Sequence, residues 1–534
     1  MQNKTVKHQK IQNGIMQIYI FAMFVVFPFY NTDMYFSLLS DRTRFFKTAT
    51  LLMVASLMIE WVRHTVILSE EDEKSFSLSL WIKSPRIVCE DLFLLLFLMI
   101  ILISAWNSSW QEAAFDGSAG RLQGAELWMY YGLSFFCVSH FYNPSRNTLY
   151  FLLIPGILIS IWGITDYLGL DIFGWLKEIK EGQRGSFSSS IGNINTYTGL
   201  IAIYLSVAGA YFIIAARNSG EKLILLFSFF ISALALIMGR SDNAVIGIMA
   251  FFLFMPFMAL GEAGRTIRFS FVLLLFGAAF PVTHFLDRYM HNPYVSNTDG
   301  ILLRLSGKSF WLFLIMAGGI LLALFCGYMK TVGEKQQRRN KLVRKKYYAI
   351  GWAGALVIAA IILCYMLYDA NFGQGPDRYG NLGIYLKFSD TWGTHRGVCW
   401  RLAVESFLEF SPIQELIGTG PETFGIVMKK QHYKEMVNAC GMIFDSPHNE
   451  FLQYLFCTGI LGALTYYGFI VTSCIKGVRS NFIGQAAAAA ILSYTAVSLV
   501  NISAPITVPF VIILAGCCAS SFRLKNGKTK NQRS

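Results

Sequence analysis

The stretch NTYTGLIAIYLSVAGAYFIIAA, residues 195–216, contains no charged side chain. One helix needs about 20 mostly apolar residues to cross a bilayer core, so this run predicts a membrane-spanning helix. Thirteen further runs have similar length and character. The fourteen predicted spans lie near 14–31, 45–66, 88–106, 126–142, 148–168, 195–216, 222–239, 243–260, 267–286, 309–329, 347–368, 450–473, 482–501 and 505–522. The sequence therefore predicts an all-α polytopic membrane protein with about 12–14 transmembrane helices.

The composition supports this class. Of 534 residues, 54% are hydrophobic and only 14% are charged, with a mean hydropathy of +0.47. A soluble enzyme would have about one-quarter charged residues, and a disordered chain would have low hydrophobicity, so both classes are excluded. The net charge of +13 does not indicate nucleic acid, because in a membrane protein the location of positive charge matters more than its sum.

Positive charge gathers in two segments. Residues 330–346 carry eight Lys and Arg, and the tail 523–534 carries five. Because cytoplasmic loops are enriched in both residue types, we expect both termini to be cytoplasmic. The chain then divides into N-terminal transmembrane helices (1–368), an extracytoplasmic loop domain (369–449), C-terminal transmembrane helices (450–522) and a basic cytoplasmic tail (523–534).

The long loop has the pattern of a folded segment. Residues 396–410, RGVCWRLAVESFLEF, predict an amphipathic helix that Ser411-Pro412 stops, and a Gly-rich turn, GTGPETF, follows at 418–424. We expect this loop to fold back over the membrane helices. With both termini cytoplasmic, this loop would lie on the outer side of the membrane, so we expect any catalytic residues on the outer face.

The segment Asp445-Ser-Pro-His-Asn-Glu directly precedes an apolar run. Ser446 is a favourable N-cap and Pro447 suits the first helical position, which would place His448 in the first turn. The partial positive charge of a helix N-terminus would keep His448 neutral and able to act as a general base. Asn449 and Gln453 are four residues apart and would bind sugar hydroxyls or orient the imidazole. The alternative is a polar helix start with a satisfied histidine.

Two arginines occupy outer connections beside predicted spans. Arg184 precedes the span that begins near Asn193, Asn195 and Thr196, and Arg240 occupies the tight turn 240–242. Planar guanidinium groups match phosphate oxygens, and their contacts are stronger near low-dielectric lipid, so the two could hold a pyrophosphate. The alternative for each is an interfacial arginine that reaches lipid phosphate.

The predicted loop helix carries a second candidate group. Arg396 and Trp400 are four residues apart and could form a stacked pair that faces a ligand. Arg401 projects elsewhere and could pair with Glu405. The loop also contains Cys399 and Cys440, which a disulfide could join.

The remaining ionisable residues and motifs point to no other chemistry. Glu60 and Arg63, three residues apart near the inner end of a span, are expected to neutralise each other. The sequence contains no metal-ligand motif, Walker loop or dinucleotide fingerprint. We therefore predict no metal and no cofactor.

Together these motifs resemble the bacterial O-antigen ligase and O-antigen polymerase superfamily. The resemblance rests on RGSFSSSIGNINT (184–196), GRSDN (239–243), 396–425 and PHNEFLQYLFCTGILGA (447–463), in that order. It implies a fold similar to the GT-C-like O-antigen ligase fold, in the cytoplasmic membrane. It also implies metal-independent, inverting glycosyl transfer from an undecaprenyl-pyrophosphate-linked glycan to an acceptor glycan on the outer face. A flippase and a chain-length regulator are the implied protein partners.

The same resemblance implies residue roles. His448 would be the catalytic base, and Arg184 and Arg240 would bind the donor pyrophosphate. Arg396 would contact the acceptor or a phosphate. A pyrophosphate is already a good leaving group, so these residues need only compensate developing charge and accept one proton.

Three functions remain open from the sequence. The leading hypothesis is a polymerase that joins repeat units, and the close alternative is a ligase that moves a finished glycan to another acceptor such as lipid A-core. The alternative of another class is a lipid-linked oligosaccharide flippase. A flippase should carry charges along a central cavity and have short loops.

Overall fold

Helices make up most of the protein. A computed structural model describes residues 2–69, 88–290, 300–307, 318–319 and 340–531. Ten helices in these ranges are long and apolar enough to cross a membrane, and α10 and α21 are shorter apolar helices. The protein is thus a multi-pass membrane protein of the all-α class, as the sequence predicted.

The N-terminal half alternates long helices with short connections. Its elements are α1 (Gln2–Phe21), η1 (Ala22–Val26), η2 (Phe27–Phe29), α2 (Leu38–Ser69), α3 (Cys89–Asn107), α4 (Gln111–Asp116), α5 (Ala125–Phe141), α6 (Arg146–Tyr167), η4 (Leu176–Glu178), α7 (Glu181–Arg184), the hairpin β1 (Phe187–Ser188) and β2 (Gly192–Asn193), α8 (Ile194–Ala215), α9 (Ser219–Met238), α10 (Asn243–Ala259) and α11 (Ala263–Tyr289).

The C-terminal half contains the long loop between two membrane helices. Its elements are α12 (Ile301–Ser306), α14 (Asn340–Phe372), η5 (Pro376–Leu382), α15 (Gly383–Leu386), α16 (Trp392–Leu408), α17 (Pro412–Ile417), α18 (Phe424–Gln431), α19 (Tyr433–Cys440), α20 (Glu450–Arg479), α21 (Phe482–Ser498) and α22 (Val508–Asn531).

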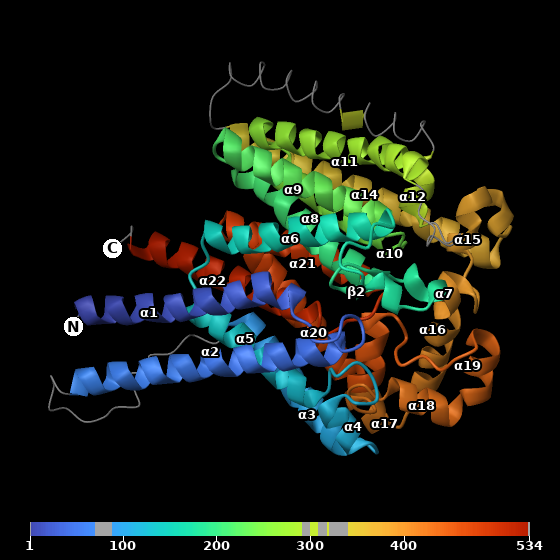
Figure 1. Cartoon of the computed structure of the whole chain (residues 1–534), viewed down its shortest axis with the longest axis horizontal. Helices are drawn as coiled ribbons and strands as arrows, with labels where there is room; N and C mark the ends of the chain where they lie inside the picture. Colours follow the sequence, from blue (N-terminus) through green and yellow to red (C-terminus); the bar gives the residue numbers. More distant parts are fainter. Residues whose placement is uncertain (1, 70–87, 291–299, 308–317, 320–339, 532–534) are drawn as a thin grey trace.

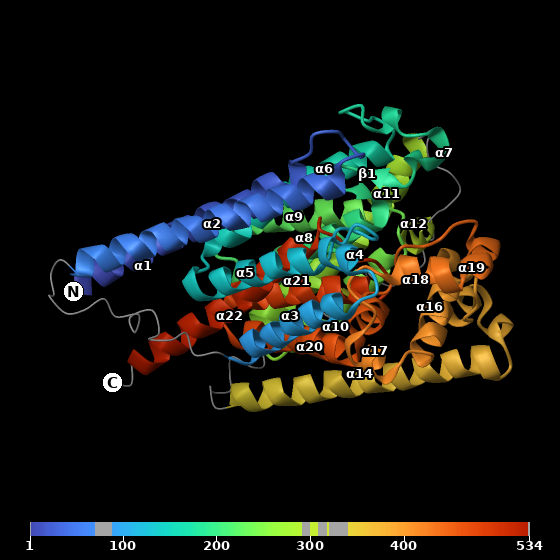
Figure 2. The ribbon, with the colours of Figure 1, turned by 90° about the horizontal axis from the view of Figure 1, so that it is seen from below.

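Thirteen of the fourteen predicted spans coincide with these helices, and the span at 309–329 lies outside the described residues. Helix α8 is almost wholly buried and packs against α9, α10 and α21. Small residues permit this packing: a Cβ on Gly247 would lie 2.8 Å from Val497 and 3.2 Å from Ala202. The apolar stretch of α14, in contrast, has no buried residue, and this helix runs along one edge of the bundle (Figure 2).

The two ends of the bundle differ. Both termini lie at one end, whereas α7 and the loop helices α15, α16, α18 and α19 lie at the other (Figure 1). The loop domain and the segment that contains Arg184 therefore lie at the same end of the molecule.

Glu60 forms the expected ion pair with Arg63, with Nε 2.7 Å from Oε2, and it also contacts His8 of α1.

Helix α20 is broken at Gly459, and the loop fills the break. Gly459 has φ +67°, which ends the regular hydrogen bonding of the first part of the helix. The amides of Thr419 and Gly420 donate to the freed carbonyls of Phe456 and Cys457, at 3.2 and 3.0 Å. A buried carbonyl that lacks a hydrogen bond is costly, so the loop supplies donors that the broken helix needs. The long loop therefore packs on the membrane helices, as expected.

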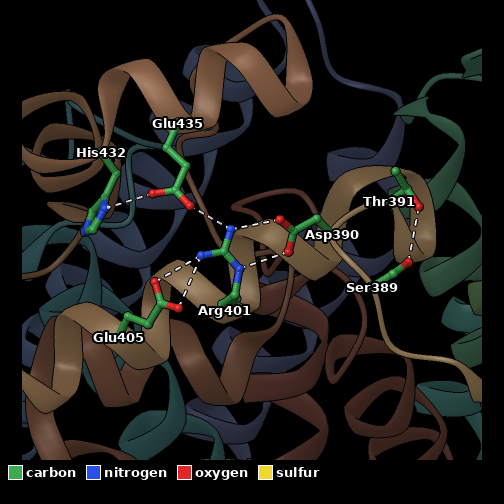
Figure 3. A network of polar contacts seen from close by, with 7 residues as sticks. All are labelled: Ser389, Asp390, Thr391, Arg401, Glu405, His432 and Glu435. Carbon is green, nitrogen blue, oxygen red and sulfur yellow. Dashed lines mark hydrogen bonds and ion pairs between the residues drawn. The ribbon is translucent and has the colours of Figure 1, made fainter. Parts of the chain in front are cut away.

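The loop helices are joined by a network of charged groups (Figure 3). Arg401 contacts the expected Glu405 at 3.1 Å and also Asp390 and Glu435, each at 2.8 Å. These hydrogen bonds, chiefly those that Arg401 donates to Asp390, raise the pKa of Arg401. The network fastens α19 and the segment before α16 to one face of α16, so Arg401 has a structural role.

Helix α16 confirms the predicted start and stop of regular helix. Residues 393–395 have left-handed backbone angles, so regular helix begins at Arg396. Ser411 caps the next helix through Gln414. Cys399 and Cys440, which the sequence could have joined by a disulfide, are both free thiols.

Candidate active site

Arg184 and Arg240 line one cavity. Arg184 ends α7, where its Nε donates to the carbonyl of Ile179 at 3.0 Å. The Arg240 Nη2 donates to the carbonyl of Gly185 at 2.9 Å, and its guanidinium lies 5.7 Å from the ring centre of Tyr167. The cavity contains about 340 Å³ of space not occupied by atoms. The structure therefore brings the two predicted arginines together, although 55 residues separate Arg240 from the carbonyl that it contacts.

The Arg240 turn has a constrained backbone. Arg240 has φ +52°, a left-handed conformation that costs energy for a residue with a side chain. Gly300 packs directly on it, since a Cβ there would lie 2.7 Å from the Arg240 carbonyl carbon. Asp242 accepts a hydrogen bond from the amide of Ile301 at 2.7 Å. The chain before α12 thus holds the turn in this conformation.

The predicted place of His448 in the first helical turn is wrong. Helix α20 begins at Glu450, and its N-cap is Asn449, whose Oδ1 accepts from the amide of Leu452 at 3.1 Å. His448 has φ +54° and lies before the cap, because Asn449 rather than Ser446 supplies the capping oxygen. Asn449 is therefore the cap of α20 and not a residue of its first turn, and its side-chain oxygen is engaged in the cap.

His448 is nevertheless held as a neutral imidazole. Its Nδ1 lies 3.2 Å from the carbonyl oxygen of Ser446, a contact that requires the proton on Nδ1 and leaves Nε2 as the acceptor. Burial, followed by the positive charges of Arg396 and Arg121, lowers the pKa of His448 to about 4. The side chain remains partly exposed, so a ligand can reach it.

Arg396 contacts the segment that follows Arg240. Its Nη1 donates to Oδ1 of Asn243 at 2.9 Å, which joins α16 to the start of α10. Burial lowers the pKa of Arg396. Since Arg396 also acts electrostatically on His448, it connects the arginine turn to the histidine.

The predicted stacking of Arg396 on Trp400 is not found among the described residues. Trp400 instead lies against Trp392, with ring centres 5.0 Å apart, and against Phe388, at 6.4 Å. The left-handed residues before Arg396 turn the chain so that these aromatic rings reach Trp400. The aromatic cluster replaces the expected cation–π pair.

Asn195 joins the arginine turn to another connection. Its Oδ1 accepts from the Ser241 hydroxyl at 2.7 Å, and its carbonyl accepts from Asn501 Nδ2 at 3.1 Å. Helix α8 begins where the sequence predicted, and of the three residues named there Asn193 is the cap, which fixes Asn195 in the first turn. Asn195 therefore has a positioning role in this structure.

A second cavity contains residues that the sequence analysis missed. It has about 230 Å³ of unoccupied space, and Gln453 is the one predicted site residue in its wall. The others are Arg121, Glu422, Ser446, Glu450, Asn501, Ile502 and Ser503. These residues come from four separate connections or helix starts, so their sequence positions do not show that they meet. The one sequence signal for this cavity was the glutamate inside the Gly-rich 418–424 turn.

Among the described residues outside the membrane helices, Glu422 has a strongly perturbed carboxyl group. It is buried, has φ +59°, and accepts a hydrogen bond from the amide of Arg121. Burial raises the pKa of Glu422 to about 7. The Arg121 side chain in turn pairs with Asp445, with Nε 3.2 Å from Oδ2, so the 117–124 and 445–449 segments meet here.

No family model matches this chain, and no curated protein matches it either.

Proposed function

We propose that the protein is a membrane glycosyltransferase that polymerises undecaprenyl-pyrophosphate-linked repeat units at the outer face of the cytoplasmic membrane. The observation that carries this proposal is the shared cavity of Arg184 and Arg240, linked through Asn243 and Arg396 to the neutral His448. Two preorganised guanidinium groups can bind the phosphates of a diphosphate, and a neutral imidazole can accept the proton of a hydroxyl.

The reaction would be a single displacement. The acceptor hydroxyl oxygen forms a bond to the anomeric carbon, the bond from that carbon to the diphosphate oxygen breaks, and the hydroxyl proton passes to Nε2 of His448. The pair of electrons leaves with the diphosphate, where Arg184 and Arg240 compensate the developing negative charge. One displacement inverts the configuration at the anomeric carbon.

The low pKa of His448 fits a base that acts only with donor bound. The charges of Arg396 and Arg121 contribute to that low pKa. A bound diphosphate would offset these positive charges, so the basicity of His448 would rise when the donor is present. In the free enzyme, Nε2 of His448 would then stay unprotonated at neutral pH, ready to take the proton of the attacking hydroxyl.

Charge distribution supports the orientation. The basic segment 330–346 and the basic tail belong to the cytoplasmic side by the positive-inside rule. The two termini lie at the end of the bundle opposite α7 and the loop helices (Figure 1). The two arginines and His448 would then face the outer leaflet, where a polyprenyl tail can enter sideways from lipid.

The test is turnover by the purified protein in lipid nanodiscs with a defined undecaprenyl-pyrophosphate-linked repeat unit. Wild type should release undecaprenyl pyrophosphate and form products two or more repeats long, while His448→Ala should form none. The Arg265→Ala variant is the control, because Arg265 pairs with Glu262 at the far end of α10. Absence of joined products from wild type, with transbilayer movement of single units in both proteins, would instead identify a flippase.

A further inference from the structure

The chain that leaves α6 exposes apolar side chains. Helix α6 ends at Gly169, which has φ +74°, and the amides of Gly169 and Leu170 donate back to carbonyls of the last helical turn, at 3.1 and 3.0 Å. The residues that follow lie at the surface. Leu170, Ile172 and Phe173 are 55%, 59% and 58% exposed. We call residues 168–175 the α6 tip.

The acidic residue of the α6 tip is buried instead. Asp171 is only 7% exposed, and its carboxylate accepts hydrogen bonds from the amides of Leu176 and Lys177, each at 3.2 Å. The tip therefore exposes its apolar side chains and buries its carboxylate. A loop in water is expected to show the reverse pattern, because exposing apolar surface and burying a charged group both cost free energy. The pattern indicates that the surroundings of the tip are apolar.

The exposed side chains of the tip continue one face of α6. Ile154, Leu158 and Ile161 are also exposed, and their spacing of four and three residues places them on the same side of the helix. Helix α6 is long and apolar enough to cross a membrane, so lipid would cover this face. Its 22 residues rise about 33 Å, against a hydrocarbon core of about 30 Å, so the tip begins where the core ends.

Aromatic rings hold the tip on the end of α6. The rings of Phe173 and Trp175 contact Trp162 of α6, with centres 4.1 and 4.9 Å apart, and Trp175 also contacts Tyr35 at 5.3 Å. Trp and Tyr are enriched where the hydrocarbon core meets the lipid headgroups. The tip is thus a packed structure whose aromatic residues are typical of that level of a membrane.

The tip connects directly to Arg184. The Arg184 guanidinium donates from Nε to the carbonyl of Ile179 at 3.0 Å and from Nη2 to that of Lys177 at 3.3 Å. Leu176, the residue after the tip, lines the same cavity as Arg184 and Arg240. The depth of the tip in a membrane would therefore set the height of this cavity relative to the lipid headgroups.

We infer that the α6 tip inserts into the bilayer, in the leaflet at the end of the bundle where α7 and the loop helices lie. Phospholipid acyl chains cover Leu170, Ile172 and Phe173. The inserted tip anchors the cavity wall that contains Arg184 at the level of the headgroups. Insertion does not depend on the proposed function, because it requires only that α6 crosses a membrane.

The experiment introduces the photocrosslinking residue p-benzoylphenylalanine at one position at a time in the full-length protein. The positions are Ile172 in the tip, Leu158 in the exposed face of α6 as the lipid reference, and Glu181 of α7 as the aqueous control, because its side chain is 89% exposed and charged. Each protein is irradiated in nanodiscs of equal parts phosphatidylethanolamine and phosphatidylglycerol. Mass spectrometry then measures the fraction of protein that carries a phospholipid adduct.

Position 172 should give as much phospholipid adduct as position 158, and position 181 should give little. A yield at position 172 as low as that at position 181 would overturn the inference. Crosslinks from position 172 to a second copy of the chain, in place of lipid, would also overturn it.

A matched pair of substitutions tests whether apolar character causes insertion. With the photocrosslinker at Leu170, Ile172→Asp should lower the phospholipid adduct about tenfold, because a carboxylate is disfavoured in lipid, whereas Ile172→Val should leave it unchanged. An unchanged adduct in a folded Ile172→Asp protein would overturn the inference. Folding is checked with the photocrosslinker at Leu158 in the same variant. If that adduct is lost too, the comparison of positions 172 and 181 decides.

Discussion

Arg240→Ala is the sharpest perturbation of the proposed donor site. The guanidinium is fixed in advance by the Gly185 carbonyl at 2.9 Å and by the ring of Tyr167. A unit charge about 4 Å from a phosphate oxygen is worth about 4 kcal/mol at an effective dielectric constant near 20. Losing such a contact at an interface costs about 2–5 kcal/mol, so the Kd for the diphosphate should rise by a factor between about 30 and several thousand.

The assay is titration of undecaprenyl pyrophosphate into nanodiscs that contain wild type, Arg240→Ala, Arg240→Lys or Arg265→Ala. Lysine keeps the charge but lacks the planar paired donors, so Arg240→Lys should fall between wild type and alanine. Arg265→Ala should bind as wild type does, because the 17 residues of α10 separate it from Arg240 by about 25 Å. A Kd within about threefold of wild type in a folded Arg240→Ala protein would refute the reasoning.

His448→Gln should lower the rate of sugar transfer by about 10²–10⁴-fold, as expected for loss of a general base, with the diphosphate Kd unchanged. A rise in the diphosphate Kd by the same factor would show that His448 binds the donor and is not the base. The free energy of unfolding of Glu422→Gln, taken relative to that of wild type, should be higher at pH 8 than at pH 5. Burial raises the folded-state pKa from 4.5 to about 7, so wild type loses about 3 kcal/mol of stability as the pH rises through that window. Thermal unfolding of both proteins at the two pH values checks this, and a pH-independent difference contradicts it. Gly418→Ala should cost about 3 kcal/mol or more, because its Cβ would lie 2.2 Å from the backbone of Cys457. Gly441→Ala, with a similar positive φ but nothing within 4 Å, should cost only about 1 kcal/mol in the same unfolding assay, and equal losses would contradict the contact argument.

Local patterns predicted the membrane helices and several of their ends. Apolar runs identify helices because the bilayer imposes a length and a composition that are read directly from the chain. The Asn193 cap and the stop at Ser411 were also predictable, since capping depends on a few neighbouring residues. Arg184 and Arg240 were predicted from residue type and turn length, and the structure places both on one cavity.

The remaining features depend on contacts between distant segments. Ser446 and Asn449 are both suitable N-caps, and the sequence alone did not decide which one is used. The cavity of Glu422 and Gln453 also required Arg121 and Asn501 to arrive from elsewhere in the chain. Trp400 was assigned the wrong partner because the left-handed residues that precede Arg396 carry no strong sequence signal.

The break in α20 has a consequence for biosynthesis. Thr419 is translated 37 residues before Phe456, whose carbonyl it will contact. A ribosome therefore finishes the loop before the helix that anchors it exists. The contacts of Thr419 and Gly420 with Phe456 and Cys457 can therefore form only after the first part of α20 has been synthesised. A stall or truncation between these two segments would leave an exposed loop for quality-control proteases, although all of its own residues had been made.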